Sequence, residues 1–207
     1  MNSYRIAVFA SGRGSNFQAI ADAVRKGTVQ AELALLVCDR PSAPVVAKAE
    51  QAGVSVFAFR PKDYHTRADY EAALVQELKQ REIDLVVLAG YMRLLTNTLV
   101  DAFYGRLINI HPSLLPAFPG VNGIGDALEY GVKWTGVTVH YVDGGMDTGP
   151  IIAQKAVEIR DDDTEETLAE RIHQVEHKLL PWVIEQFQLN RVRLEGRKVK
   201  LDCCLPG

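Results

Sequence analysis

Asp84–Ala89 reads DLVVLA and is apolar after its first residue. A strand this apolar is typical of a parallel sheet whose two faces are both covered by helices. The preceding chain alternates short β-rich runs with segments of helical periodicity, at Arg5–Ala10, Phe17–Lys26, Leu33–Cys38, Ala43–Ala52, Val54–Phe59 and Arg67–Arg81. This alternation predicts consecutive βαβ units, and therefore an α/β fold with a doubly wound, mostly parallel sheet in which the 84–89 strand is central.

The chain after this strand is less regular but still predicts defined elements. Short helices are expected at 97–103 and 124–129, and strands at 107–110, 136–142 and 151–157. Asp163 followed by Glu166 is typical of a capping box that opens a long C-terminal helix. The tail at 192–201, around Glu195-Gly196-Arg197, predicts a small terminal hairpin.

Length and composition bound the class of protein. The 207 residues suit a single domain, residues 1–207, which can bury one core without a cofactor. A net charge of -3 with both signs interspersed argues against nucleic-acid or anionic-membrane binding, so small-molecule partners are expected. The five histidines form no metal-binding motif, and the N-terminal apolar run is too short for a signal peptide or a membrane span. We therefore expect a cytoplasmic protein without a metal, as a monomer or a homodimer.

The first chemical motif is the turn Ser11–Asn16, SGRGSN, between the first predicted strand and the first predicted helix. Its glycines permit close approach of the backbone, and the helix N-terminus offers N–H groups and a positive dipole end to a phosphate. Phe17 stands where a dinucleotide-binding motif would have its third glycine, so a monophosphate fits better than NAD. The turn alone does not distinguish a phosphate site from a turn that is glycine-rich for backbone geometry only.

Two further motifs place polar side chains after strands. In Asn109–Pro116, NIHPSLLP, Asn109 and His111 are two residues apart and share one face of an extended chain. Asp143–Pro150, DGGMDTGP, is a loop between two strands and carries two carboxylates. Taken singly, these residues also fit an ordinary cap, a structural histidine and an Asp/Gly turn. Together, the three motifs predict loops that a doubly wound sheet could bring to one edge.

These motifs occur together in a known family. The chain resembles the folate-dependent phosphoribosylglycinamide formyltransferases of purine biosynthesis over essentially its whole length, from the Ser-Gly-x-Gly-Ser-Asn turn to Val175-Glu176-His177. The Asn-x-His-Pro-Ser-Leu-Leu-Pro and Asp-x-Gly-Pro-Ile segments are specific for the wider formyltransferase superfamily. We expect neither the additional C-terminal domain of the methionyl-tRNA formyltransferases nor the N-terminal regulatory domain of the formyltetrahydrofolate hydrolases in a chain of this length.

The resemblance implies a formyltransferase fold with a phosphate-binding half, residues 1–100, and a catalytic and folate-binding half, residues 101–207. It implies an enzyme that transfers the formyl group of 10-formyltetrahydrofolate, its co-substrate, to the amine of glycinamide ribonucleotide. The positions that match the family's sites are the catalytic trio Asn109, His111 and Asp147; Gly14, Ser15 and Asn16 at the substrate phosphate; Glu176 at the ribose; and Arg67, Met92, Arg93, Leu94, Leu95, Asn109 and Asp143 in the folate pocket.

The trio suggests direct transfer without a covalent enzyme intermediate. Asn109 and His111 are expected to donate hydrogen bonds to the oxyanion that develops on the formyl group. Asp147 is expected to orient His111, to favour its protonated form and to relay the amine proton to the leaving nitrogen.

Two other functions remain compatible with the motifs, and one position departs from the family. A hydrolase would send the formyl group to water, and a phosphate-binding module would keep the turn without catalysis. Many relatives carry His, or a Lys-Asp pair, where this chain has Val121-Asn122-Gly123. Asn122 cannot exchange protons, which puts an auxiliary acid-base role at this position in doubt.

Overall fold

The computed structural model describes residues 3–205, which divide into two compact units. Unit 1 extends to Ile108 and unit 2 begins at Asn109. Seven of the nine strands of the described residues belong to a mostly parallel sheet, and the other two form a hairpin. This confirms the predicted α/β fold class. The predicted functional halves, 1–100 and 101–207, stay a prediction.

The strands of unit 1 follow one another in parallel. They are β1 (Tyr4–Phe9), β2 (Ala31–Cys38), β3 (Ser55–Ala58) and β4 (Leu85–Leu88), and β5 (Leu107–His111) begins at its end. Their order is β3-β2-β1-β4, and every one of these pairings is parallel. All of β4 and the last four residues of β1 are buried, as expected of strands that are covered on both faces.

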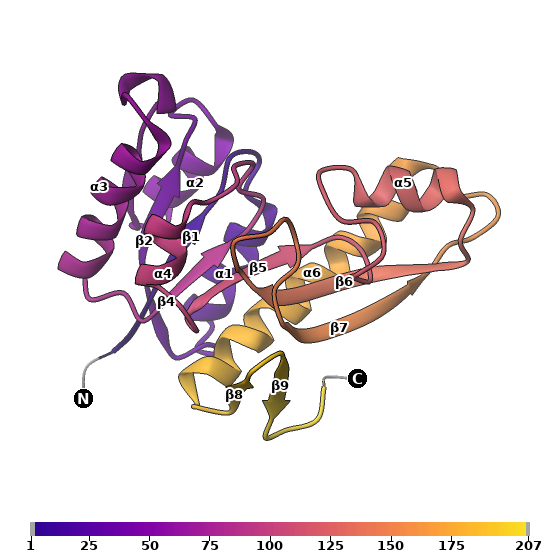
Figure 1. Cartoon of the computed structure of the whole chain (residues 1–207). Helices are drawn as coiled ribbons and strands as arrows, with labels where there is room; N and C mark the ends of the chain where they lie inside the picture. The colour runs from indigo at the N-terminus through magenta and orange to yellow at the C-terminus, as the bar shows by residue number, and fades with distance from the viewer. Residues whose placement is uncertain (1–2, 206–207) are drawn as a thin grey trace. The chain divides into compact units, whose positions relative to one another are not determined.

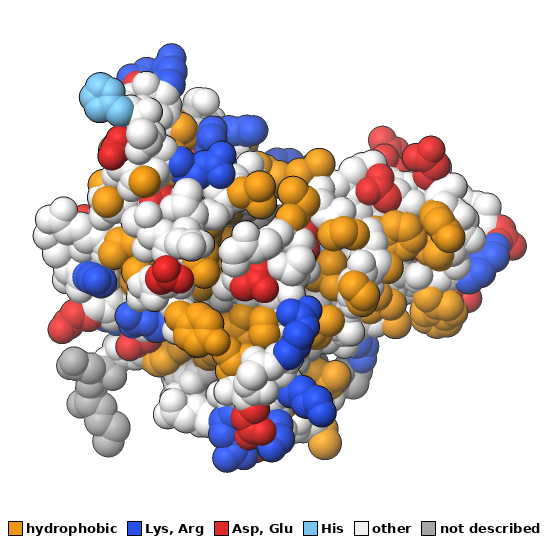
Figure 2. Space-filling model, in the orientation of Figure 1, with side chains coloured by type: hydrophobic (Ala, Val, Ile, Leu, Met, Phe, Trp, Pro, Cys, Tyr) orange, Lys and Arg blue, Asp and Glu red, His pale blue; other side chains and the backbone are white. Residues whose placement is uncertain are grey.

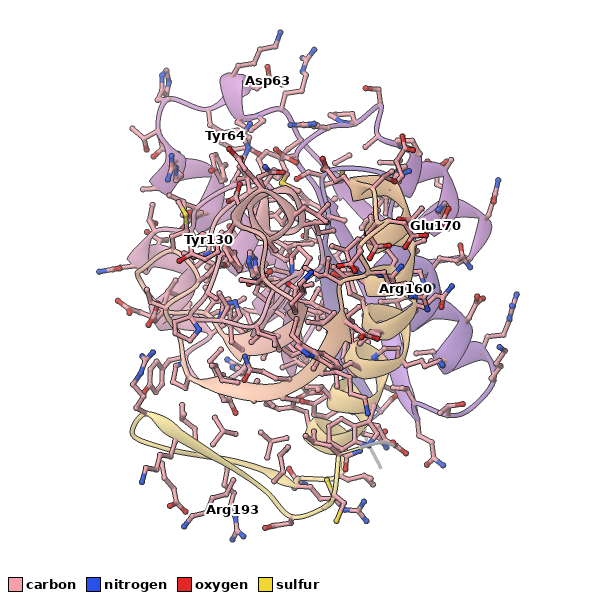
Figure 3. The ribbon with its side chains drawn as sticks, turned by 90° about the vertical axis from the view of Figure 1, so that its right-hand side faces the viewer. Asp63, Tyr64, Tyr130, Arg160, Glu170 and Arg193 are labelled. Carbon is pink, nitrogen blue, oxygen red and sulfur yellow. The ribbon has the colours of Figure 1, made fainter. Side chains whose placement is uncertain are left out.

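Helices connect these strands: α1 (Ser15–Arg25), α2 (Pro44–Gln51), the short 3-10 helix η1 (Pro61–Asp63), α3 (Arg67–Gln80) and α4 (Asn97–Ala102). α1 and α2 both pack against β2, and α3 packs against α4 (Figure 1). Thr66 and Asp69 form a reciprocal capping box at the start of α3. Asp63 and Tyr64 lie at the end of η1, at the top edge of unit 1 in Figure 3.

The strand order of unit 1 reverses at β1, which has β2 and β3 on one side and β4 on the other. In open α/β sheets, ligands bind outside the carboxyl ends of the strands at such a reversal point. β1 leads into the turn 11–16, and β4 leads into the segment 89–96. The predicted phosphate turn and the predicted folate residues 92–95 therefore leave neighbouring strands at the reversal point.

Unit 2 consists of α5 (Gly123–Tyr130), β6 (Trp134–Tyr141), β7 (Ile151–Glu158), α6 (Glu165–Gln188), β8 (Val192–Glu195) and β9 (Lys198–Leu201). β6 and β7 form a long antiparallel pair, and α6 packs along both strands (Figure 1). The register of this pair shifts between Val139 and His140. The long C-terminal helix and the terminal hairpin confirm the prediction. Arg193 points outward from the hairpin (Figure 3) and binds Asp202.

The start of α6 differs from the prediction. Thr164 is the N-cap, and it exchanges hydrogen bonds with Thr167 in the capping box that Asp163 and Glu166 were expected to form. The carboxylate of Asp163 instead binds the guanidinium of Arg171, two turns further along the helix. This hydrogen bond holds the pKa of Asp163 well below its ordinary value. Asp163 therefore lies one residue before the N-cap, where its carboxylate binds Arg171 and the hydroxyl of Thr167 instead of capping the helix backbone.

The surface of unit 2 carries apolar side chains at its α5 end (Figure 2). Val121, Tyr130 and Trp134 are all more than half exposed, and the ring of Tyr130 contacts that of Phe118 at a centroid distance of 5.8 Å. No helix between residues 3 and 205 combines the length and the apolar character needed to span a membrane.

Candidate functional site

The predicted phosphate turn in unit 1 is built around Gly14. This residue is the N-cap of α1 and has a left-handed backbone, with φ 70°. A Cβ atom at Gly14 would lie only 2.4 Å from Cγ2 of Val45, so the turn excludes any side chain here. Gly12 is different, because a Cβ atom there would have no neighbour within 4 Å and its φ is not positive. The fold itself therefore requires Gly14 but not Gly12.

In unit 2, the carboxylate of Asp147 lies at the centre of a polar cluster. Oδ2 accepts a hydrogen bond from the backbone N–H of Gly120 at 2.8 Å and lies 3.5 Å from Nδ1 of His111. Oδ1 lies 3.4 Å from Nδ2 of Asn109 and 3.6 Å from Nε2 of His140. The structure thus brings the predicted trio together, and it adds His140 to the set.

Burial and hydrogen bonding act on Asp147 in opposite directions. Burial alone would raise the pKa of its carboxyl group. The nearby His140, the hydrogen bond from the backbone N–H of Gly120 and the neighbouring His111 outweigh that effect, so the net pKa lies below its ordinary value. Asp147 is therefore an anion at neutral pH, held in a site where only 13% of its side chain is exposed.

His111 is buried at the end of β5, between two acceptors. Its Nε2 lies 2.8 Å from the carbonyl oxygen of Phe118, and its Nδ1 faces the carboxylate of Asp147. A carbonyl oxygen can only accept, so Nε2 carries a proton and donates it to Phe118. A protonated ring would donate to both neighbours at once, which is the arrangement that suits an imidazolium beside a carboxylate.

Asn109 shares one face of β5 with His111, as the two-residue spacing predicted. Its Nδ2 lies 3.1 Å from Nε2 of His140 and 3.4 Å from Oδ1 of Asp147. His140 was missed from the sequence because it lies inside β6, where apolar and polar residues do not alternate cleanly. The signal that could have identified it is a histidine in the last two residues of a strand, three residues before Asp143 of the Asp-Gly loop.

Comparison with known proteins identifies the family. Residues 4–184 match the family model for formyl transferases. The phosphoribosylglycinamide formyltransferase of Bacillus subtilis is 55% identical over 182 residues, which are 88% of this chain and 93% of that protein. The chain belongs to the phosphoribosylglycinamide formyltransferase family. It is also 45% identical over 179 residues to a segment that makes up 13% of the trifunctional purine biosynthetic protein adenosine-3 of Drosophila melanogaster.

Solved structures of this family have the same fold. The structure of glycinamide ribonucleotide transformylase 1 from Symbiobacterium toebii has a TM-score of 0.94 at 45% identity, covering 96% of this chain and 94% of that chain. The corresponding protein from Geobacillus kaustophilus has a TM-score of 0.88 at 56% identity, covering 90% of this chain and all of that chain.

The predicted folate residues of this formyltransferase in unit 1 are held by side chains from other elements. Arg93 donates to the buried carboxylate of Asp39 at 2.6 Å, and Arg67 donates to the carbonyl oxygen of Leu94 at 3.1 Å. The side chains of Met92 and Leu94 are about half exposed, at 57% and 51%. The segment therefore combines a fixed backbone with apolar side chains that reach solvent, while Leu95 is half-buried.

Two hydrogen bonds tie this folate segment to the phosphate turn. The backbone N–H of Ser11 donates to the carbonyl oxygen of Gly90 at 3.0 Å, and Oγ of Ser11 accepts from the backbone N–H of Met92 at 3.0 Å. Ser11 itself is buried. Ser11 is thus hydrogen-bonded to the residues before and after Tyr91.

A second tether comes from Glu71 on α3, whose side chain is fully buried. Its carboxylate accepts from the backbone N–H of Thr96 at 2.8 Å, from the hydroxyl of Thr96 at 2.6 Å and from the backbone N–H of Leu99 at 3.3 Å. Sequence reasoning missed Glu71, which looks like an ordinary helix residue. The carboxylate fixes the end of the 92–95 segment and the start of α4.

The remaining predicted residues lie in unit 2. Glu176 is buried on α6, where its Oε2 lies 2.9 Å from Nδ1 of His173, and the rings of His173 and His177 stack with centroids 6.2 Å apart. Glu176 is therefore a buried carboxylate beside a histidine. Asp143 accepts from the backbone N–H of Gly145 and the hydroxyl of Thr148 and so shapes the 143–150 loop.

Asn122, the position that departs from the family pattern, binds a neighbour on its own helix. Its Nδ2 donates to the carboxylate of Asp126 at 3.0 Å, one turn along α5. The residues between 3 and 205 contain no group of three or more His, Cys, Asp or Glu side chains arranged to hold a metal ion.

Proposed function

We propose that this member of the family transfers the formyl group of 10-formyltetrahydrofolate directly to the amine of glycinamide ribonucleotide. The observation that carries the proposal is the cluster of Asn109, His111 and Asp147, in a chain that is 55% identical to a phosphoribosylglycinamide formyltransferase. In the reaction, the amine nitrogen forms a bond to the formyl carbon, the bond from that carbon to the folate nitrogen breaks, and a proton moves from the amine to that nitrogen.

Asp147 is the group that moves this proton. Its lowered pKa keeps it ionised at neutral pH, so it is available as an acceptor and stabilises a protonated His111 beside it. The hydrogen bond from Gly120 holds Oδ2 in place during the transfer. The carboxylate takes the proton of the attacking amine and passes it on to the leaving nitrogen, directly or through a water molecule.

Asn109 and His111 stabilise the negative charge that develops on the formyl oxygen. Fixed donors aimed at such a charge contribute most in a buried site, where water does not screen them. The Nε2–H of His111 donates to the carbonyl oxygen of Phe118, and the oxyanion competes for the same proton during the reaction. The amide of Asn109 supplies the second donor.

The turn that contains Gly14, Ser15 and Asn16 holds the phosphate of the acceptor. Its left-handed glycine and the start of α1 support this assignment, because backbone N–H groups and the positive helix end favour an anion. Glu176, a buried carboxylate, accepts hydrogen bonds from the ribose hydroxyls. The family resemblance assigns Arg67 and the 92–95 segment of unit 1, and Asn109 and Asp143 of unit 2, to folate binding. No step requires a metal, and the partners are small molecules in the cytoplasm.

The test is a single incubation with 10-formyltetrahydrofolate, with and without glycinamide ribonucleotide. Deformylated folate and formylated product are both quantified. The proposal expects one mole of formylated product for each mole of folate released, and no release without the acceptor. Release of formate at the same rate without the acceptor would identify a hydrolase, and no turnover under either condition would identify a phosphate-binding module.

A further inference from the structure

His140 is a buried histidine to which the proposed chemistry assigns no task. It lies near the end of β6 with 2% of its surface exposed. The β6–β7 register shifts directly before it, so His140 pairs with Ile151 although Val139 pairs with Ala153. Irregularities of this kind re-aim a side chain and are common beside active sites. The shift turns the imidazole toward Asn109 and Asp147.

The two hydrogen-bond partners of His140, Tyr141 and Asn109, are closer than the Asp147 carboxylate at 3.6 Å, and they fix the tautomer of the neutral ring. Nδ1 lies 2.8 Å from the carbonyl oxygen of Tyr141, and a carbonyl oxygen can only accept, so Nδ1 carries the proton. In a neutral ring, Nε2 then has a lone pair and no proton. Nε2 is the atom that faces Nδ2 of Asn109 at 3.1 Å, so it accepts a hydrogen bond from the amide.

This tautomer also fixes which end of the Asn109 side chain faces inward. The two partners of the amide, Nε2 of His140 and Oδ1 of Asp147, are both acceptors, so both require the NH₂ group and neither suits the carbonyl oxygen. The two contacts differ in strength, because 3.1 Å is an ordinary hydrogen-bond length and 3.4 Å is long. One amide N–H is therefore firmly held by His140, and the other is only weakly engaged.

We propose that His140 is a positioning residue that holds one N–H of Asn109 and thereby directs the second N–H toward the oxyanion. This inference rests on the proposed function. If the acceptor at Nε2 is removed, the amide of Asn109 is free to turn by half a rotation about its terminal bond. It would then present its own oxygen to the oxyanion and repel it. His140 thus acts through Asn109 and touches no reacting atom.

The first test compares His140→Phe with His140→Gln. Phenylalanine fills the site without an acceptor, whereas glutamine offers a carbonyl oxygen close to the position of Nε2. Removal of an oxyanion donor lowers kcat by about 10²–10³-fold, and loss of its orientation should lower kcat by about tenfold or more in His140→Phe, with KM for both substrates little changed. His140→Gln should recover much of the loss. Equal losses in both folded variants would overturn the proposal.

The second test is a double-mutant cycle with Asn109→Ala. If His140 acts through Asn109, His140→Phe should have almost no further effect on kcat once Asn109 is gone. A structural role would instead give losses that multiply. The same cycle with Asp147→Asn is the comparison: because the His140–Asp147 contact is longer, its coupling should be clearly smaller than the coupling with Asn109→Ala.

The third test needs neither activity nor a variant. Nuclear magnetic resonance of the wild-type protein labelled with ¹⁵N-histidine reports which ring nitrogen carries the proton. The neutral His140 ring should be protonated at Nδ1 and unprotonated at Nε2. A ring protonated at Nε2 would overturn the proposal even in a fully active enzyme. If the wild type fails to transfer formyl groups, the proposed function fails, and the proton position still decides whether His140 holds the Asn109 amide.

Discussion

The backbone N–H of Gly120 donates to the Oδ2 atom of Asp147 at 2.8 Å, while Asp147 itself has a left-handed backbone with φ 55°. A non-glycine residue in this conformation costs on the order of 1–3 kcal/mol and persists only where its surroundings determine it. Here the surroundings are the Gly120 amide and the polar side chains around the carboxylate. The strain therefore serves to present one carboxylate in one orientation.

Asp147→Asn should lower kcat strongly, by about two orders of magnitude or more, on the scale of removing a key electrostatic group. Asparagine keeps the size of the side chain, but one of its two terminal atoms becomes a donor, and every neighbour of Asp147 in the cluster is a donor or a histidine. Folate binding should change much less. The measurement is steady-state kinetics with binding of a folate analogue, and an unchanged rate would remove Asp147 from the proton-transfer role.

The lowered pKa of Asp147 also predicts a pH dependence of stability. A carboxyl group whose pKa is lower in the folded than in the unfolded chain stabilises the fold above its unfolded pKa of about 3.9, and this contribution is lost as the pH falls through the folded pKa. The difference in unfolding free energy between wild type and Asp147→Asn should narrow as the pH falls below about 4. Urea unfolding at a series of pH values measures it. A difference that widened in acid would contradict the lowered pKa.

His111→Ala and Asn109→Ala should each lower kcat by about two orders of magnitude, because each removes one donor to the oxyanion. The KM values for both substrates should change little if these donors act mainly in the transition state. Single-turnover rates and equilibrium binding separate the two effects. A loss confined to binding would assign these residues to substrate recognition only.

The phosphate turn is best tested at Gly12, because a side chain at Gly14 would strike Val45 and strain the fold. Gly12→Ala should leave stability nearly unchanged and raise the KM for glycinamide ribonucleotide, with the KM for folate unaffected.

Gly27→Ala is the matched control for the stability effect at Gly14. Gly27 has φ 73° and open space around it, so this substitution should cost only the left-handed strain of about 1–2 kcal/mol. Gly14→Ala should cost clearly more than Gly27→Ala. An unchanged acceptor KM in Gly12→Ala would mean that the phosphate does not pass over this residue.

Glu71→Leu should lower the free energy of unfolding by about 1–3 kcal/mol, because the part-buried backbone N–H and the hydroxyl of Thr96 lose their acceptor. Folate affinity should fall as well, since the 92–95 segment loses its anchor at Thr96. Glu77→Leu on the same helix is the control: Glu77 pairs with Arg81 near the surface and should cost less than about 1 kcal/mol. Similar losses in the two variants would show that Glu71 is not a special anchor.

The sequence predicted the order of strands and helices because apolar residues recur with the two-residue period of strands and the 3.6-residue period of helices. β4, α3 and α6 lie close to where their apolar patterns placed them. The pairing of Asn109 with His111 on one face followed from the two-residue period of a strand. Predictions failed where a long-range partner decides the outcome. Thr164 rather than Asp163 is the N-cap of α6, and the Asp163 carboxylate binds Arg171, eight residues further along the chain. The contacts of His140 with Asn109 and Asp147 join residues more than five positions apart in the sequence, so the alternation of residues along β6 alone did not identify it.

Ser11 connects two loops of unit 1, the turn 11–16 and the segment that contains Gly90 and Met92. One buried serine begins the turn assigned to the acceptor and is bonded at Gly90 and Met92 to the segment assigned to the folate. Neither loop can swing outward without stretching a hydrogen bond to the other, so their fluctuations are correlated. We therefore expect that a ligand that orders one of these loops also restrains the other through Ser11.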